Sequence, residues 1–314
     1  STLLTHLTGG SAGREGASIQ FGGSIGNWLG KLAHLDEFDH HVMIMCGMSA
    51  AFAAVFGTPM AAAVFAMEVV SVGVMYYAAL LPCVIAAIIA AEFATGMGID
   101  PETFPVHSIP GLTVETGLKM ALIAVGCGIL SILFCILLKT VGQLYAKYLK
   151  NPYIRIVVAA GVIILITICL NTKDYMGAGS GLIARAIEKG EARPLDFLWK
   201  MLLTALTMRA GYRGGEIVPA FSIGATFGCV AGGILGFSPE LAAAASMVAL
   251  FCGVTNCPIT AMLISFELFG FSGAAYYLIA ISISYAVSGY YSLYKDQTIV
   301  YSKYKARYIN RKTR

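Results

Sequence analysis

The stretch GGSAGREGASIQFGG, residues 9–23, places six glycines around the adjacent charged residues Arg14 and Glu15. Glycines beside the start of a helix let backbone N–H groups turn toward a small anion, and the helix dipole adds about half a positive charge at that end. The stretch therefore predicts an anion cradle. The Glu15 carboxylate is itself an anion, so it can occupy this cradle when ionised and leave it when protonated.

The composition of the whole chain is that of a membrane protein. Of its 314 residues, 58% are hydrophobic and 12% are charged, whereas soluble domains average about 25% charged residues. Most of its uncharged runs reach the roughly 20 residues that a bilayer requires; they cover residues 42–67, 69–91, 120–138, 156–172, 217–239, 241–266 and 268–294. Gly or Pro interrupts several of them, as in VFGTPMAA (55–62) and VTNCPITA (254–261). We expect an all-α, polytopic membrane protein of about a dozen helices, many of them short and in broken pairs.

The charged residues predict the orientation of the chain in the membrane. One loop and the C-terminal tail are rich in basic residues, which mark the cytoplasmic side; they are Lys139, Lys147, Lys150 and Arg155 in the loop and Lys303, Lys305, Arg307, Arg311, Lys312 and Arg314 in the tail. Residues 96–117 hold acidic residues without Lys or Arg, which fits an external loop. The net charge of +4 therefore reflects topology, and we expect no nucleic-acid partner.

The cysteines and histidines predict neither a metal site nor a disulfide framework. All eight cysteines lie in apolar segments without a CxxC pair, and the five histidines show no metal-ligand spacing. Reduced thiols that pack as small hydrophobic groups explain the cysteines. No cofactor is implied.

An internal repeat divides the chain into two related halves. Residues 52–68 (FAAVFGTPMAAAVFAME) align without a gap to residues 251–267 (FCGVTNCPITAMLISFE), matching the first Phe, a Pro and the last Glu. A glycine-rich turn with its own glutamate precedes each segment: Glu15 lies 53 residues before Glu68, and Glu216 lies 51 residues before Glu267. Such repeats in transporters commonly run in opposite directions and place the substrate site at their interface, near the middle of the membrane.

Two other interpretations of residues 9–23 remain open. GGSAG (9–13) matches the G-x-S-x-G pattern of serine hydrolases, which would make Ser11 the nucleophile of an intramembrane enzyme. In a purely structural interpretation, the glycines permit close helix packing and Glu15 pairs with Arg14. An ionisable residue inside a membrane is functional by default, which favours the anion cradle.

Several motifs together resemble one known family. GREGASIQFGGSIG (13–26) is similar to the G-R-E-G-P-x-x-Q-x-G-G-x-x-G signature of the CLC family of chloride channels and anion/proton antiporters, and GGEIVPAF (214–221) resembles its second signature, G-G-x-F-x-P. The similarity continues through residues 56–70, 255–268 and the tyrosine-rich C-terminal region, and covers nearly the whole chain. It implies an inverted-repeat fold, a homodimer, transport of a halide ion and protons across a lipid bilayer, and a bacterial plasma membrane as the location.

The resemblance also implies roles for individual residues. Glu15 becomes the external gating glutamate, and Gly13, Arg14, Gly16 and Ala17 become its supporting turn. Backbone N–H groups around Glu216, Ile217 and Val218 face the central anion. A tyrosine hydroxyl from the last helix completes the site, with Tyr294 as the better match and Tyr291 as the alternative. Either tyrosine could instead belong to a membrane-interface belt.

Departures from the family pattern favour fluoride over chloride. Val69 stands where the chloride/proton exchangers carry an internal proton glutamate, Ala17 replaces a proline, and Glu216 replaces an aliphatic residue. This combination is similar to the fluoride/proton antiporter branch, although Val218 stands where that branch often has Thr. Glu216 and Glu15 are then the proton-coupling residues. A chloride/proton exchanger or an anion channel is the alternative, and Glu216 in a salt bridge with Arg209 or Arg213 is the structural alternative.

The expected organisation is one integrated membrane domain in three parts. Residues 1–116 form the remainder of the first half, residues 117–290 form the second half, and residues 291–314 form the last helix and a basic cytoplasmic tail. Chloride-transporting members of the family contribute a serine from a Gly-Ser-Gly-Ile-Pro motif upstream of the gating turn, and this sequence contains no such motif. N-terminal helices of the family are therefore expected to be absent from it.

Overall fold

The computed structural model describes residues 2–305 and 307–313, so Arg314 of the basic tail lies outside the described residues. The described part holds thirteen α-helices, one short 3-10 helix and three short strands. The helices are α1 (Thr2–Leu7), α2 (Glu15–Leu32), α3 (Glu37–Phe56), α4 (Pro59–Glu68), η1 (Tyr77–Ala79), α5 (Leu80–Gly96), α6 (Val114–Tyr148), α7 (Pro152–Leu170), α8 (Ser180–Glu188), α9 (Asp196–Ala210), α10 (Ile217–Ile234), α11 (Pro239–Thr255), α12 (Pro258–Phe269) and α13 (Ala274–Val287). The predicted helical class is confirmed.

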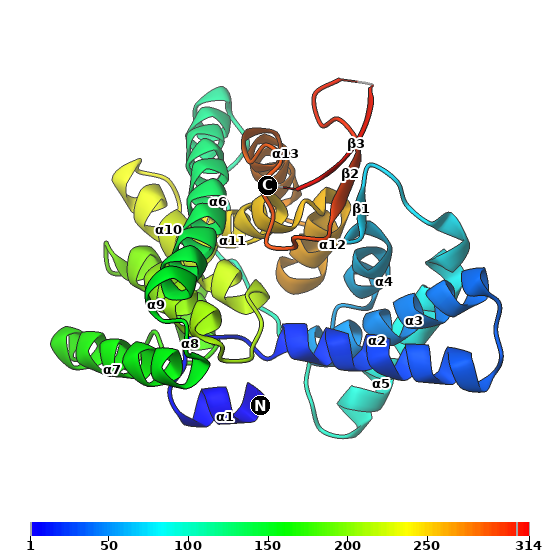
Figure 1. The fold of residues 1–314 in the computed structure, drawn as a ribbon. Helices are drawn as coiled ribbons and strands as arrows, with labels where there is room; N and C mark the ends of the chain where they lie inside the picture. The colour runs from blue at the N-terminus through cyan, green and yellow to red at the C-terminus, as the bar shows by residue number, and fades with distance from the viewer. Residues whose placement is uncertain (1, 306, 314) are drawn as a thin grey trace.

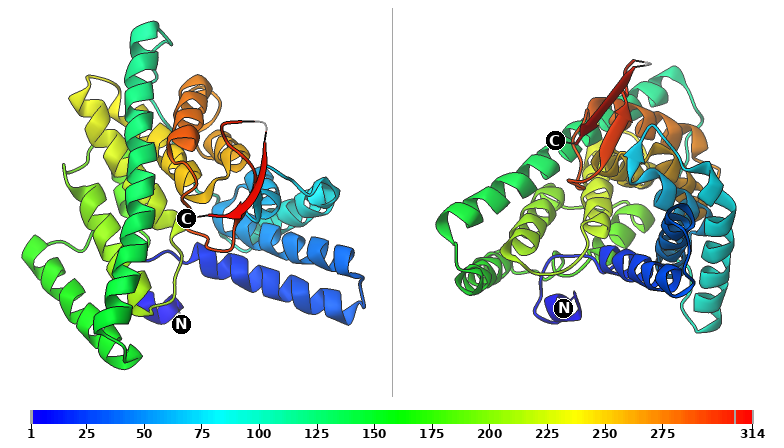
Figure 2. Two further views of the ribbon diagram at one scale, coloured as in Figure 1. Left: turned by 45° about the horizontal axis from the view of Figure 1, so that its top comes forward. Right: turned by 45° about the vertical axis from the view of Figure 1, so that its right-hand side comes forward.

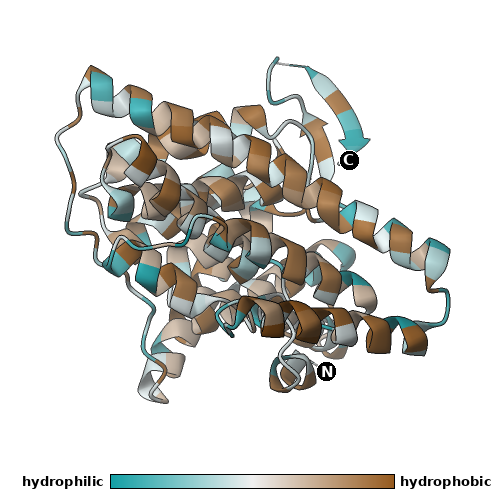
Figure 3. Ribbon diagram, turned by 90° about the vertical axis from the view of Figure 1, so that its left-hand side faces the viewer, coloured by the Kyte–Doolittle hydropathy of each residue, from teal (hydrophilic) through white to brown (hydrophobic). Residues whose placement is uncertain are grey.

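Several helices are long and apolar enough to cross a membrane. Among the described residues there are five: α3, the segment Tyr77–Gly96, α6, α7 and α10. Large apolar side chains on the outside of α7, among them Val157, Leu165 and Ile168, are exposed, and hydrophobic residues cover much of α6 and α7 (Figure 3). In a water-soluble protein such patches would be a liability, whereas lipid covers them at no cost. The chain is an integral membrane protein.

The helices gather in two groups around a shared core. In Figures 1 and 2, α2 to α5 lie on one side and α6 to α10 on the other, with α11 to α13 between them. Contacts between α4 and α12 join the first group to the central helices, and contacts between α10 and α11 join the second group to them. Four rings from both groups pack in sequence: Phe52 on Phe65 with centroids 5.0 Å apart, Phe65 on Phe251 at 6.2 Å, and Phe251 on Phe221 at 5.2 Å.

The two predicted breaks within helix pairs occur at equivalent positions of the repeat. The residue that caps the C-terminus of α3 is Gly57, with φ of 68°, and the residue that caps α11 is Asn256, with φ of 60°. Both residues adopt the left-handed conformation that ends helices, and Gly and Asn tolerate it best. A proline then occupies the first position of the next helix, Pro59 in α4 and Pro258 in α12. The prediction of Pro-broken helix pairs is confirmed.

The closing glutamates of the repeat cap each other's helices. Glu68, at the end of α4, accepts hydrogen bonds from Ile259 N at 3.1 Å and from Thr260 N and Oγ1 at 2.9 and 2.6 Å, at the start of α12. Glu267, near the end of α12, accepts from Met60 N and Ala61 N, both at 2.9 Å, at the start of α4. A carboxylate at a helix N-terminus satisfies otherwise unpaired N–H groups and complements the helix dipole. Each half therefore completes a helix of the other.

The expectation of a last helix within residues 291–314 is wrong. The last helix, α13, ends at Val287, and the chain then forms β2 (Thr298–Tyr301) and β3 (Tyr308–Lys312). Strand β2 pairs in parallel with β1 (Ser71–Val72) and antiparallel with β3. Thr298, Ile299 and Val300 are β-branched, which favours extended backbone. Strand β1 lies in the loop after α4 and provides the edge with which β2 pairs.

Candidate functional site

The two glycine-rich turns meet at the centre of the site. Gly13 and Gly215 form an isolated antiparallel bridge, in which Gly13 N donates to Gly215 O at 2.8 Å and Gly215 N donates to Gly13 O at 2.7 Å. A Cβ atom on Gly215 would lie 2.7 Å from Gly16 N, so this approach requires glycine. The N-termini of α2 and α10, and the unpaired N–H groups of their first turns, are thereby brought together.

Glu15 is the first residue of α2, and its side chain folds back over its own turn. A Cβ on Gly13 would clash with Glu15 Oε2. That oxygen is buried and has no hydrogen-bond partner among the described residues, and Oε1 lies 4.0 Å from Arg14 Nε. The Glu15 side chain is 6% exposed whereas that of Arg14 is 70% exposed. The carboxylate thus lies beside the helix start, where an anion would bind, and Arg14 points away from the core.

Glu216 precedes α10 at the equivalent position of the second half. Its Oε1 lies 3.8 Å from Arg209 Nη2, so the ion pair considered from the sequence is formed with Arg209. Glu216 also lines a cavity of about 290 Å³ together with Gly16, Ile217 and Tyr294. The carboxylate can therefore serve both as the partner of Arg209 and as a wall of this cavity.

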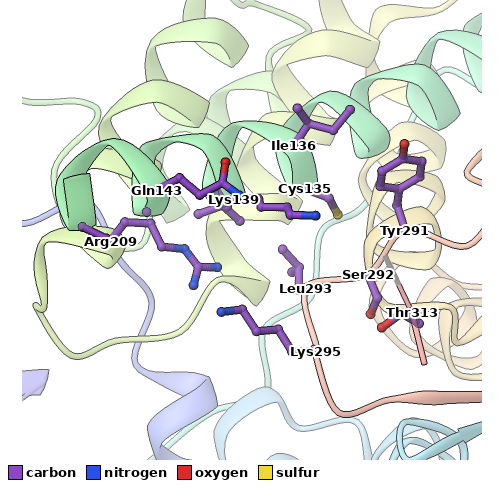
Figure 4. Close-up of a pocket in the computed structure, with 13 residues that line it drawn as sticks. Cys135, Ile136, Lys139, Gln143, Arg209, Tyr291, Ser292, Leu293, Lys295 and Thr313 are labelled. Carbon is purple, nitrogen blue, oxygen red and sulfur yellow. The ribbon is translucent and has the colours of Figure 1, made fainter.

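The structure separates the two candidate tyrosines. Tyr294 lines the cavity that contains Glu216 and Gly16, as does Val69, whereas Tyr291 lines a second cavity of about 510 Å³. Figure 4 shows the charged ends of Lys139, Arg209 and Lys295 directed toward the space of this second cavity, and none of the described residues that line it is acidic. Only Tyr294 is grouped with the predicted site, which favours it over Tyr291.

The remaining predicted residues surround these groups. Gly16 lines the cavity, and Ala17 follows it in the first turn of α2. Ile217 and Val218 begin α10 and are buried in the core shared by the two groups of helices. The side chain of Val218 thus packs in the core, and the part that it can offer an anion is its backbone N–H.

Ser11 lies two residues before the bridge and is enclosed by α9. Its Oγ lies 3.0 Å from both Thr204 Oγ1 and Lys200 Nζ, and its N–H donates to Thr207 Oγ1 at 3.1 Å. We did not predict these α9 residues from the sequence. A signal was present, because Lys200 is a lone lysine within the otherwise uncharged run FLWKMLLTALTM (197–208), and such a residue calls for a partner in a membrane.

Comparisons with known proteins identify similar ion-transport proteins. A family model described as "Voltage gated chloride channel" matches residues 1–289. The chain is 33% identical over 312 residues to the "Chloride/fluoride channel protein" of Pseudomonas syringae pv. tomato, covering 96% of this chain and 68% of that protein. It is 28% identical over 272 residues to the "H(+)/Cl(-) exchange transporter ClcA" of Vibrio cholerae, covering 82% of this chain and 58% of that protein.

A solved structure is also similar over most of its length. It is described as "Crystal structure of a CLC-type fluoride/proton antiporter", with a TM-score of 0.90 and 35% identity, and the match covers 94% of this chain and 75% of that one. A slow cyanobacterial Cl−/H+ antiporter matches with a TM-score of 0.73 at 19% identity, which shows likeness of fold alone.

Proposed function

Because the chain belongs to the voltage-gated chloride channel (CLC) family, we propose that it exchanges a halide for a proton across the membrane, and that it exports fluoride in preference to chloride. The observation that carries this proposal is the Gly13–Gly215 bridge, which joins the two turns that precede α2 and α10. In this proposal the N-termini of both helices and the carboxylates of Glu15 and Glu216 surround one anion site. The likeness to a fluoride/proton antiporter supports the choice of ion.

The proposed cycle follows from competition for one place. Ionised Glu15 lies at the helix start and excludes the anion, since two negative charges cannot share the same N–H groups at close range. Protonation removes this charge, and the side chain leaves with its proton while the anion takes its place. The anion and the proton then move in opposite directions.

Glu216 is the second proton carrier in this proposal. Val69 cannot carry a proton. Two carboxylates, Glu216 and Asp296, line the cavity beside Gly16 and Tyr294, and Asp296 is exposed and paired with Lys312, which leaves Glu216 as the half-buried carboxylate of the cavity. When protonated, Glu216 can donate a hydrogen bond to the anion, and fluoride gains most from such a donor because its charge is the most concentrated.

We further propose that the protein acts as a homodimer in a bacterial plasma membrane, with a cytoplasmic C-terminus, and that it transports ions rather than catalysing hydrolysis. The environment of Ser11 supports the last point. Ser11 is 1% exposed, and the neighbouring Lys200 Nζ donates to two backbone carbonyls as well as to Ser11. An amine that is engaged in this way is a poor general base.

Liposomes test the proposal directly. The reconstituted protein is given an outward gradient of fluoride or of chloride, and anion efflux is recorded together with internal pH. We expect fluoride efflux with proton uptake. Chloride efflux of equal size would remove the fluoride assignment, and anion efflux without proton movement would identify a channel.

A further inference from the structure

Helix α9 carries a buried polar face that the proposed cycle does not use. Asp196, Lys200, Thr204 and Thr207 are all fully buried. They are spaced by four, four and three residues, which places their side chains on one face of the helix. Polar side chains in such surroundings require hydrogen-bond partners, and a buried ammonium group is the most costly of them.

Three of these side chains contact the same residue, Ser11. Lys200 and Thr204 contact its hydroxyl, and Thr207 accepts a hydrogen bond from its backbone N–H. Ser11 is therefore fixed through both its main chain and its side chain. From Ser11 the chain continues through Ala12 to Gly13 of the bridge, and then to Glu15 at the start of α2.

Lys200 also fixes a second segment against the first. Its Nζ donates to Gly177 O at 2.7 Å and to Tyr175 O at 3.1 Å, and Gly177 N donates to Gly10 O at 2.9 Å. The three acceptors around Nζ match the three N–H donors of an ammonium group. Asp196 holds the same segment from one turn earlier, since its Oδ1 accepts from Tyr175 Oη at 2.6 Å.

The positive charge of Lys200 has no carboxylate within ion-pair distance among the described residues. The carboxylate of Asp196 is bound instead by Tyr175 and Arg185. Neutral oxygen atoms of Ser11, Tyr175 and Gly177, rather than a salt bridge, therefore hold the Lys200 side chain beside the first glycine-rich turn. Helix α9 contacts the first glycine-rich turn through its side chains. It ends at Ala210, and the chain then leads directly into the second glycine-rich turn, which contains Gly215.

We propose that Lys200 is a positioning residue of the exchange site. Through Ser11 it holds the first glycine-rich turn against the second, so that the N–H groups of both turns face one anion while the Glu15 side chain moves. Small displacements of such groups are costly for binding and turnover. This inference rests on the proposed function.

The test uses three substitutions in the full chain and one matched control. Lys200→Met removes the ammonium group at similar volume, Ser11→Ala removes its acceptor, and Thr204→Val removes a hydroxyl that contacts Ser11 while leaving Lys200 in place. Thr167→Val is the control, because Thr167 Oγ1 bonds only to Ile163 O of its own helix in the described contacts. The measurements are the fluoride KM and kcat, the fluoride-to-proton ratio, and hydrogen exchange of residues 9–16.

We expect Lys200→Met to raise the fluoride KM about tenfold, the effect typical of losing one charge-assisted contact. Ser11→Ala raises it less, and the double variant is no worse than Lys200→Met alone, because both act through one contact. Hydrogen exchange at residues 9–16 becomes faster in all three, and Thr167→Val leaves every measurement unchanged.

If the KM increase in the double variant equals the product of the increases in Ser11→Ala and Lys200→Met, the two residues act independently and the proposal is overturned. An unchanged fluoride KM together with unchanged hydrogen exchange in folded Lys200→Met would also overturn it. If Lys200→Met does not fold, Ser11→Ala and Thr204→Val decide, and unchanged exchange at residues 9–16 in both overturns it. Hydrogen exchange requires no ion flux. It therefore still tests the role of Lys200 if the wild-type protein carries no fluoride and the proposed function fails.

Discussion

Glu15 carries a buried carboxylate oxygen that has no hydrogen-bond partner among the described residues. The Arg14 side chain lies 4.0 Å from the other oxygen, Oε1, and is mostly exposed, so this ion pair adds little to holding the carboxylate in place. Gaining a proton or moving the side chain relieves this state. Both changes are steps of the proposed cycle.

Glu15→Gln should abolish proton coupling, because Gln resembles the protonated acid but cannot release a proton. We expect proton uptake driven by a fluoride gradient to fall to the level of empty liposomes, while the protein folds normally. Internal pH and fluoride efflux are measured in the same vesicles. Full coupled exchange by this variant would leave Glu15 with only a structural role beside Arg14.

Glu216→Gln should retain fluoride binding and lose coupled turnover, whereas Glu216→Ala should impair both. Gln can still donate a hydrogen bond to the anion, and Ala cannot. Fluoride binding by calorimetry and flux in liposomes separate the two effects. Normal folding and exchange at the original rate in Glu216→Gln would assign this carboxylate to its ion pair with Arg209 alone.

At the scale of elements, α2 and α10 meet through backbone with no room for a side chain. Gly215→Ala places a methyl group against Gly16 N. This is a backbone atom of α2, and it cannot move aside as the end of a flexible side chain can. We expect at least a hundredfold loss of fluoride flux. The matched control is Gly233→Ala in the same helix α10, where a Cβ meets nothing within 4 Å, and its flux should be unchanged. Equal flux in both variants would contradict the role of the bridge.

The reciprocal caps should contribute to stability. Glu68→Gln replaces one accepting oxygen with an N–H₂ group that faces N–H donors, and we expect a loss of about 1–3 kcal/mol. Glu115→Gln is the control, because Glu115 forms an exposed pair with Lys119 on the surface of α6, where such pairs contribute little to stability. Thermal unfolding in detergent compares them. A midpoint for Glu68→Gln that matches the control would show that this cap is not stabilising.

Residue patterns predicted the two helix breaks correctly, but they predicted a helix in the C-terminal segment where the chain forms strands. Gly57–Pro59 and Asn256–Pro258 act locally, since a left-handed residue followed by proline ends one helix and begins another. Strand β2 instead depends on pairing with β1, about 230 residues earlier in the chain. The contact of Lys200 with Ser11 joins residues 189 apart. No local pattern records such a pairing, although the lone lysine within residues 197–208 indicated that a partner was needed.

For the whole molecule, the distribution of charge predicts that residues 139–155 and the C-terminal segment share the cytoplasmic side. Cysteines engineered at Lys147 and Lys312 should resist an impermeant thiol reagent applied to intact cells, and one at Glu102 should react. The background is Cys169→Ser, because Cys169 is exposed whereas the other seven cysteines are buried or half-buried. Labelling of Lys147→Cys or Lys312→Cys from outside would contradict this topology.

The exchange of glutamates between α4 and α12 also has a consequence for biosynthesis. The backbone N–H groups of Met60 and Ala61 are capped by the carboxylate of Glu267, which lies more than 200 residues further along the chain. At 5–20 residues per second, the ribosome needs about 10–40 s to deliver it. During that interval the first half stands in the membrane with the start of α4 uncapped, and a polypeptide released before Glu267 never acquires that cap. The first half therefore remains an incompletely capped intermediate until the chain has been synthesised beyond Glu267.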